Sequence, residues 1–381
     1  MDFAFTEEQL AIQDVARRIA QEKIAPSAEH HDVTGEFPLA NIRTLGENGL
    51  MGIEVPHEYG GAGMDPVSYV LAMIEIAHAD CAHSTIVSVN NSLFCNGILK
   101  FGTEAQKQLY VRAIAEGREI GAFALTEPQS GSDATAMKCR AVKQADGRFV
   151  INGKKSWITS GPVARYIVLF AMSEPGKGAK GITAFMIDTN KPGFHRGKTE
   201  PKLGIRASAT CEIEFTDYVA EVDEVLGTEG EGFKIAMSVL DVFRSTVGAA
   251  ALGFARRALD EALARVKSRK IGGAPLADLQ MVQGHLADMA VQVDAAALLI
   301  YRAAWTKDQG AARVSKEAAM AKLYATEAAQ KIIDMAVQLH GGDGVRHGFA
   351  VEALYREIRA LRIYEGASDV QRIVIARSIL G

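Results

Sequence analysis

The sequence predicts an α+β fold in which an N-terminal helical domain, a central β domain and a C-terminal helical domain follow one another. Two changes of pattern along the chain predict this order. Hydrophobic residues recur at helical spacing near both ends, whereas residues 121–230 contain short runs rich in β-branched and aromatic residues, separated by Gly, Pro and Asn. We therefore place the domains at residues 1–120, 121–230 and 231–381.

The first helical region opens with a helix-start signal. Thr6 and Gln9 have the spacing of a capping box, and Phe5 with Leu10 would supply the matching hydrophobic staple. A Gly-rich stretch at residues 55–65 interrupts this region, and further helices are expected after it.

The central region is typical of an antiparallel sheet because its apolar runs are short and bounded by turn residues. The expected strands are residues 149–159, 166–172, 182–188 and 211–215. The stretch G-K-G-A-K-G (176–181) has the spacing of a dinucleotide-binding fingerprint, but that motif needs a strand before it and a helix after it. Because an expected strand follows, we interpret the stretch as a hairpin loop.

The last region returns to long Ala-rich helices, of which residues 316–342 are an example. Its larger apolar side chains can share one helix face, formed by Met320, Leu323, Ile332, Met335, Ala336 and Leu339. Gly341 and Gly342 are expected to end this helix.

Composition excludes several classes of function. The 381 residues are 48% hydrophobic with a formal net charge of −4, and they lack the basic stripe of a nucleic-acid-binding surface. The four cysteines include no C-x-x-C pair, so they favour neither a disulfide framework nor a zinc site. The N-terminus has no signal-peptide pattern, and no apolar run approaches the roughly 20 residues needed to cross a bilayer. We therefore expect a cytoplasmic protein that binds neither nucleic acid nor a membrane.

The sequence contains no H-E-x-x-H, G-x-S-x-G or P-loop motif, and His78 and His83 are too far apart to ligate a metal from one helix face. Three polar stretches remain, which taken singly could be an ordinary loop, a core tryptophan and a helix C-cap. They are F-A-L-T-E-P-Q-S-G-S-D-A (123–134), K-S-W-I-T-S-G (155–161) and Q-L-H-G-G-D-G (338–344).

Glu365 is a lone carboxylate with apolar neighbours on both sides, in the stretch R-I-Y-E-G-A. If these neighbours remove it from water, its pKa rises and it becomes a stronger base. The alternative is an ordinary helix-end glutamate that forms an ion pair with Arg359 or Arg362.

Taken together and in order, these stretches resemble the acyl-CoA dehydrogenase family over essentially the whole chain. The motifs are T-E-P-Q-S-G-S-D, W-I-T, R-A-S-A-T-C-E, G-E-G-F, Q-L-H-G-G-D-G and I-Y-E-G-A-S-D-V-Q-R. The resemblance implies an N-terminal helical domain, a central β domain, a C-terminal four-helix bundle and FAD as cofactor. It also implies an acyl-CoA substrate, a homotetramer built as a pair of dimers, and re-oxidation by an electron-transferring flavoprotein.

The resemblance implies a role for each matching residue. The flavin ring would be bordered by Phe123, Leu125, Thr126, Trp157 and Thr159, with the two threonines as hydrogen-bond partners. The FAD site shared with the neighbouring subunit would contain Arg269, Gln280, Gln338, Gly341 and Gly342. The substrate would contact Ser132, which also belongs to the cofactor site, together with Asp241, Arg244, Gly366 and Arg377.

Glu365 falls on the catalytic base of the family. An α-proton next to a thioester is weakly acidic, so its removal needs a base whose pKa lies near the working pH. In the family, a flavin ribityl hydroxyl and the backbone N–H of the base polarise the thioester carbonyl. Loss of the α-proton and of a β-hydride to the flavin would give a trans-2-enoyl-CoA, and Gly366 would leave room for the substrate.

The sequence departs from the family pattern at several positions. Some relatives carry the base near residue 243, where Phe243 cannot ionise. Its ring would narrow the acyl pocket toward short or branched chains, and N-N-S-L-F (90–94) resembles the short-chain members. In the inferred FAD neighbourhood, Gly272 replaces a common phenylalanine, and Ala367 and Asp369 replace a common Thr and Gln.

Two alternatives stay open. A protein on the same fold could use molecular oxygen as acceptor, or desulfinate or decarboxylate a special acyl-CoA. A rival of another class is a non-catalytic acyl-CoA-binding protein. Glu365 argues against the latter, because a pure binder has no use for a buried base.

Overall fold

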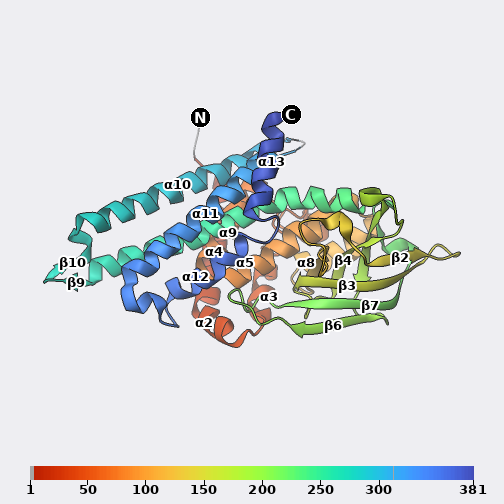
Figure 1. Cartoon of the computed structure of the whole chain (residues 1–381), viewed down its shortest axis with the longest axis horizontal. Helices are drawn as coiled ribbons and strands as arrows, with labels where there is room; N and C mark the ends of the chain where they lie inside the picture. The colour runs from red at the N-terminus through yellow and green to blue at the C-terminus, as the bar shows by residue number, and fades with distance from the viewer. Residues whose placement is uncertain (1–3, 312) are drawn as a thin grey trace.

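The computed structural model describes residues 4–311 and 313–381. Figure 1 shows an elongated molecule with a β-sheet at one end, long helices at the other, and helix α9 (Gly232–Ser268) running between the two. The fold class predicted from the sequence is confirmed, because helical regions precede and follow a β region. The domain boundaries at residues 120 and 230 stay a prediction.

The N-terminal region is a set of short helices in which α4 packs on α9 and α1 packs on α4. The α-helices are α1 (Glu7–Ile19), α2 (Ala25–Thr34), α3 (Leu39–Glu47), α4 (Pro66–Ala79), α5 (Cys81–Ser88), α6 (Asn96–Phe101), α7 (Glu104–Gln106) and α8 (Arg112–Ala115). Wider π-helical turns join some of them, namely η1 (Ala20–Ile24), η3 (Val89–Cys95) and η4 (Lys107–Val111).

The predicted capping box at the start of α1 is confirmed. The backbone N–H of Gln9 donates to the Thr6 hydroxyl over 3.2 Å, and the Gln9 side-chain oxygen accepts from the Thr6 N–H over 3.0 Å. The two residues of the expected hydrophobic staple, Phe5 and Leu10, have different surroundings. Leu10 is 43% exposed, while the ring of Phe5 packs edge-on against Tyr301 of the later helix α10.

The β region forms one eight-stranded sheet in the order β6-β7-β3-β2-β4-β5-β8, with β1 paired to β4. Its strands are β1 (Gly121–Ala124), β2 (Arg140–Lys143), β3 (Phe149–Thr159), β4 (Tyr166–Met172), β5 (Ile182–Asp188), β6 (Phe194–Thr199), β7 (Thr210–Ala220) and β8 (Val225–Leu226). The expected wholly antiparallel arrangement needs correction, because β1 and β2 pair with β4 in parallel. Such pairings join segments distant in sequence, which an alternation pattern does not report.

The stretch at residues 176–181 is a connection between two strands, as predicted. It joins the antiparallel neighbours β4 and β5, and its last part forms the short 3₁₀ turn η6 (Gly178–Gly181) directly before β5. No helix follows the glycines there, so this stretch lacks the helix N-terminus that a pyrophosphate would need.

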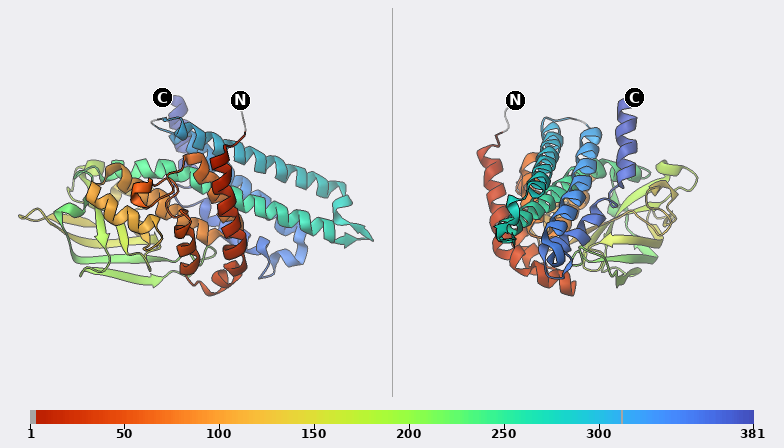
Figure 2. Two further views of the ribbon diagram at one scale, coloured as in Figure 1. Left: turned by 180° about the vertical axis from the view of Figure 1, so that it is seen from behind. Right: turned by 60° about the vertical axis from the view of Figure 1, so that its left-hand side comes forward.

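The C-terminal region consists of α9, α10 (Gln280–Asp308), α11 (Ser315–His340), α12 (Ala350–Leu361) and α13 (Ser368–Leu380). A small hairpin of β9 (Lys270–Ile271) and β10 (Ala274–Pro275) connects α9 to α10 at the tip opposite the sheet (Figure 1). Figure 2 shows α10 and α11 beside α9, and α13 standing apart near the C-terminus.

Helix α9 is long and apolar enough to cross a membrane, judged by length and composition. However, 82% of its most apolar window of 18 residues is buried in the fold, against α4, α10 and α11. It is therefore a core helix. Its 37 residues extend about 55 Å at 1.5 Å per residue, which explains how it reaches from the sheet to the far hairpin.

Helix α11 ends as predicted at the glycines, since Gly341 adopts the positive φ of +63° that favours glycine. The predicted apolar face is partly correct. Ile332 and Ala336 are buried, whereas Met320 and Leu323 are half-buried. The buried face is instead mostly small, formed by Ala318, Ala321, Ala325 and Ala329 together with the fully buried Lys322.

Candidate functional site

Glu365 lies in the tight turn between α12 and α13 with an unusual backbone conformation. Its φ is +57°, and Gly366 follows with a φ of +89°. A left-handed conformation is strained for a residue other than glycine, and such residues persist only where the surroundings hold them. The turn therefore presents Glu365 in a fixed, costly geometry.

Buried polar side chains from two helices hold this turn. The Lys322 ammonium from α11 donates to the carbonyl oxygens of Tyr364 over 3.1 Å and Gly366 over 2.8 Å. The amide of Gln371 from α13 donates to the carbonyls of Glu365 over 3.2 Å and Gly366 over 2.7 Å. Both donors are fully buried, so these hydrogen bonds do not compete with bulk water.

Glu327 of α11 ties the two ends of the turn to the same helix. It accepts from the Arg362 guanidinium over 3.0 and 2.7 Å and from the Ser368 hydroxyl over 2.6 Å. Arg362 therefore pairs with Glu327 and not with Glu365, which excludes Arg362 as the ion-pair partner of Glu365. Among the ion pairs of the described residues, none joins Arg359 to Glu365.

The surroundings of Glu365 set its basicity. Burial raises the pKa of Glu365 to about 7, and the positive charges of Lys322 and then Arg244 oppose this rise. In turn, burial lowers the pKa of Lys322 to about 8, against the opposing charge of Glu365. A carboxyl group with such a pKa can accept a proton near neutral pH, and the role of Glu365 as the base stays a prediction.

The structure gives a reason for Gly366 besides the predicted one, and the substrate contact stays a prediction. A Cβ atom there would lie 2.6 Å from the Gln371 amide nitrogen, and the φ of +89° would be strained for any side chain. The glycine therefore allows the Gln371 contact and the turn itself, and room for a substrate is not needed to explain it.

Two segments predicted to border a flavin ring lie side by side. The backbone N–H of Ser156 in β3 donates to the carbonyl of Thr126, just beyond β1, over 2.9 Å. The fully buried Lys155 donates to the carbonyl of Leu125 over 3.0 Å and pairs with Glu127 over 2.8 Å. Phe123, Leu125, Thr126, Trp157 and Thr159 are therefore brought together on neighbouring segments.

These residues suit a planar aromatic cofactor. Trp157 is 64% exposed and has a φ of +60°, which is a costly arrangement for a large apolar residue that has nothing to cover. Phe123 and Leu125 are half-buried against the same hydrophobic core as Tyr364, the neighbour of Glu365. An isoalloxazine ring placed against Trp157 would bury its exposed face.

The second group of predicted cofactor residues lies elsewhere in the chain. Arg269 and Gln280 flank the β9–β10 hairpin, and Gln338, Gly341 and Gly342 end α11. The two parts adjoin, because Arg265 of α9 donates to the His340 carbonyl over 3.0 Å and pairs with Asp343 over 2.9 Å. The hairpin is at the opposite end of the molecule from the sheet (Figure 1), so a single chain does not unite both groups.

Four further predicted residues are near the C-terminal helix or in exposed loops. Ser132 is exposed in the loop after β1, and Ala367 precedes α13 directly. Asp369 is exposed and pairs with Arg372 over 2.8 Å, while Arg377 is exposed on the last turns of α13. In the described part of the chain, none of these four side chains forms a hydrogen bond with the Glu365 turn. The carbonyl of Ala367 accepts from the Gln371 N–H at the start of α13.

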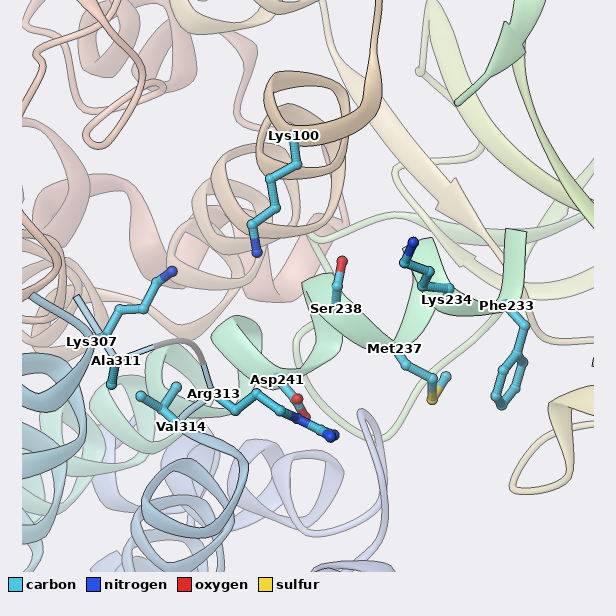
Figure 3. A pocket seen from close by; sticks show the side chains of 10 residues that line it. All are labelled: Lys100, Phe233, Lys234, Met237, Ser238, Asp241, Lys307, Ala311, Arg313 and Val314. Atoms are coloured by element: carbon cyan, nitrogen blue, oxygen red, sulfur yellow. The ribbon is translucent and has the colours of Figure 1, made fainter. Parts of the chain in front are cut away.

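A cavity of about 380 Å³ opens beside the first turns of α9 (Figure 3). Lys100 reaches into it from α6 and Lys307 from the end of α10, toward Ser238 of α9. Burial and then the nearby charge of Lys307 lower the pKa of Lys100, against the charges of Glu54 and Asp241. Its other lining residues are Phe233, Lys234, Met237, Asp241, Ala311, Arg313 and Val314.

Asp241 connects this cavity to the Glu365 turn. Its carboxylate accepts from Arg244 over 2.6 Å and from the Ser315 hydroxyl over 2.6 Å. Arg244 is buried, its Nε has no partner in the described structure, and its charge lowers the pKa of Glu365. Asp241 and Arg244 therefore lie between the cavity and Glu365, and their contact with a substrate stays a prediction.

Sequence reasoning missed the basic side chains of the cavity and the two buried donors of the turn. Lys100, Lys307 and Arg313 come from three separate elements, and no spacing links them. Lys322 had one available signal, since a lysine among alanines on a buried helix face needs an acceptor.

Comparison with known proteins identifies relatives along the whole chain. Family models described as Acyl-CoA dehydrogenase N-terminal, middle and C-terminal domain match residues 6–118, 122–218 and 230–380. The chain is 44% identical over 376 residues to an acyl-CoA dehydrogenase of Bacillus subtilis (strain 168), covering 99% of both chains. It is 42% identical over 379 residues to a short-chain specific acyl-CoA dehydrogenase of Clostridium acetobutylicum, covering 100% of both.

Solved structures share this fold. Butyryl-CoA dehydrogenase from Megasphaera elsdenii has a TM-score of 0.97 and 39% identity over 100% of both chains. A chain from a structure described as "Electron transferring flavoprotein of Acidaminococcus fermentans: Towards a mechanism of flavin-based electron bifurcation" has a TM-score of 0.97 and 42% identity, again over 100% of both. A glutaryl-CoA dehydrogenase from Mycobacterium smegmatis in complex with FADH2 has a TM-score of 0.93 and 28% identity, covering 98% of this chain and 95% of the other.

Proposed function

This chain belongs to the acyl-CoA dehydrogenase family, and we propose that its Glu365 carboxylate removes the α-proton of an acyl-CoA thioester. The protein is an oxidoreductase with FAD as cofactor. When bound, FAD supplies the acceptor for the β-hydride. The product of the reaction is then a trans-2-enoyl-CoA.

The observation that carries this proposal is the state of Glu365. Its pKa of about 7 lies near neutral pH, and two nearby arginines pair with other carboxylates, Arg362 with Glu327 and Arg244 with Asp241. A carboxylate held in a strained turn, half-buried and without an ion pair in the described structure, is arranged for proton transfer and not for stability.

The backbone supports the same chemistry. Within the described hydrogen bonds, the N–H of Glu365 donates to no protein acceptor. It is therefore available to a thioester carbonyl, where charge develops as the α-proton leaves. The fixed turn orients this N–H and the carboxyl side chain together, so one residue would polarise the carbonyl and remove the proton.

The basic cavity suits the coenzyme A part of the substrate. Lys100, Lys234, Lys307 and Arg313 bring four positive charges to one opening, and phosphate groups bind such clusters. Asp241 and Arg244 lead from this opening toward Glu365. We infer that the phosphates lie among the basic side chains and the acyl end near Glu365, so raised salt should increase KM more than it lowers kcat.

The acyl group is proposed to be short. Phe243 is fully buried on α9, directly before Arg244, and we infer that its ring narrows the space for the acyl chain. Asn90, from the stretch compared with short-chain members, holds β1 instead: its side-chain oxygen accepts from the Gly121 N–H over 2.8 Å. Equal activity on long-chain substrates and butyryl-CoA would remove this proposal.

The electron acceptor is proposed to be an electron-transferring flavoprotein. The support is the likeness of this chain to a chain in the structure described as an electron transferring flavoprotein of Acidaminococcus fermentans. A stopped-flow mixture of reduced protein and such a flavoprotein should transfer electrons in the absence of air. Rapid peroxide production in air would point to an oxidase instead, and release of sulfite or carbon dioxide to a desulfinase or decarboxylase.

The central test is anaerobic bleaching of the yellow protein by butyryl-CoA. We expect wild type to bleach, Glu365→Gln to bind FAD but not bleach, and Glu365→Asp to retain a little activity because its shorter arm displaces the base. Glu8→Gln, on the exposed face of α1, is the matched control and should bleach normally. Normal bleaching of Glu365→Gln, or a colourless protein that FAD does not restore, would contradict the proposal.

A further inference from the structure

The turn that carries Glu365 depends on one buried lysine of another helix. Lys322 is fully buried in α11, and its ammonium donates to the carbonyls on either side of Glu365, those of Tyr364 and Gly366. We propose that Lys322 is a positioning residue, which holds the strained turn in the conformation from which Glu365 acts and faces its carboxylate with a positive charge. This proposal rests on the proposed role of Glu365.

The identity of the acceptors supports a positioning role. An ammonium is costly to bury without partners, and buried lysines usually meet a carboxylate. Among the described residues, Lys322 forms no ion pair within 4.0 Å, and both of its hydrogen-bond acceptors belong to the Glu365 turn. The contacts are those expected if the lysine serves the backbone of that turn.

The neighbouring charges leave Lys322 facing Glu365. Three charged groups act on Lys322, namely Glu365, Arg244 of α9 and Glu327 of its own helix. Glu327 is already paired with Arg362 and bonded to Ser368. Arg244 is likewise paired with Asp241. Glu327 is therefore engaged by other groups, and Arg244, a second cation, cannot neutralise Lys322. Lys322 comes before Arg244 among the charges that lower the pKa of Glu365.

Gln371 provides an uncharged comparison for Lys322, because it donates to the same turn. Its fully buried amide also donates to the turn, to the carbonyls of Glu365 and Gly366, but it carries no charge. Its side-chain oxygen has no partner in the described structure, so leucine removes only the donor, and the Gly366 carbonyl keeps its bond from Lys322. Loss of Gln371 loosens the turn alone, whereas loss of Lys322 loosens the turn and removes the charge.

The experiment measures the rate of anaerobic bleaching by butyryl-CoA against pH in the FAD-loaded protein. For Lys322→Met, we expect a rate about 10-fold to 100-fold lower, because small displacements of a catalytic group have effects of this size. Its acid limb, near pH 7 in wild type, should also move upward by about one pH unit, because an opposite charge no longer favours the ionised carboxyl.

Three controls separate the explanations. Gln371→Leu should be slower with an unmoved acid limb, and Lys331→Met, an exposed lysine of the same helix, should match wild type. Lys322→Gln, which keeps a neutral donor, serves where Lys322→Met does not fold, and the same upward shift is expected. Bound FAD and melting temperature are recorded for every variant.

The outcomes are distinct. A slower Lys322 variant with an unmoved acid limb would overturn the electrostatic part and leave a structural residue like Gln371, and an unchanged rate would overturn the whole proposal. Normal bleaching by Glu365→Gln would contradict the proposed base itself, whatever the Lys322 variants do.

Discussion

At the scale of single residues, the main feature of the site is that Glu365 forms no ion pair among the described residues. The sequence left two interpretations of this glutamate, a buried base or a partner of Arg359 or Arg362. The structure pairs Arg362 with Glu327 and places Glu365 in a left-handed turn, with a pKa raised to about 7 by burial. Apolar neighbours predicted the desolvation, but no local pattern could predict the partner of Arg362, because Glu327 is 35 residues away.

Tertiary contacts that the sequence does not report explain two further residues, Gly366 and Lys322. Gly366 was expected to make room for a substrate, whereas its positive φ and the nearby Gln371 amide already require a glycine. Lys322 belongs to no motif of the sequence and is fully buried. Tertiary hydrogen bonds from α11 and α13 to the turn between α12 and α13 act at both positions, and no local sequence pattern reports them.

At the scale of secondary structure, the strands were the best predicted elements. The expected ranges of β3, β4 and β5 agree with the structure, because each is rich in β-branched and aromatic residues and is bounded by turn residues. β1 leads into Leu125 and Thr126, which are predicted to border the flavin, and it was not predicted as a strand. It pairs with β4 in parallel and is only four residues long, so its identity depends on tertiary contacts.

The junction of β1 and β3 rests on a buried ion pair. The Lys155 ammonium bonds the Glu127 carboxylate and the Leu125 carbonyl, and Glu127 also accepts from the backbone N–H groups of Lys138 and Cys139. Although burial raises the pKa of Glu127, the Lys155 charge and these hydrogen bonds bring it below its ordinary value. The pair therefore fixes the two segments predicted to border the flavin.

We predict that Lys155→Met destabilises the protein by about 3–5 kcal/mol, because Glu127 is left buried without its partner. FAD should also be lost more readily, since the Leu125 segment loses its tie to β3. Urea unfolding and retained flavin absorbance measure the two effects. The adjacent Lys154→Met breaks only an exposed pair with Glu214 and should cost about 0–1 kcal/mol. Equal stability of the two variants would contradict this account.

At the scale of the whole molecule, most of the predicted FAD residues form two groups at opposite ends of the molecule. Trp157 and Thr159 lie on the sheet, whereas Arg269, Gln280 and the end of α11 lie near the far hairpin (Figure 1). We propose that a neighbouring subunit brings its own hairpin end to the sheet of the first, within a homotetramer. Sequence motifs predicted the residues through family resemblance, but their separation within a chain becomes visible only in the fold.

We therefore predict that FAD retention depends on assembly. Arg269→Ala should leave the far-UV circular dichroism unchanged but release FAD on gel filtration, because an exposed arginine is lost from the pyrophosphate contact. Lys267→Ala, an exposed lysine two residues earlier, is the matched control and should retain FAD. A monomeric wild-type protein with full FAD occupancy would contradict the shared site.

The most direct test of the account follows the α-hydrogen itself. A 3-thia-acyl-CoA has sulfur in place of the β-carbon and cannot release a β-hydride, so exchange of its α-hydrogens with D₂O reports the base alone. By NMR we predict rapid exchange with wild type and with Glu8→Gln, and exchange at least about 100-fold slower with FAD-loaded Glu365→Gln. Equally rapid exchange with Glu365→Gln would show that another group removes the proton.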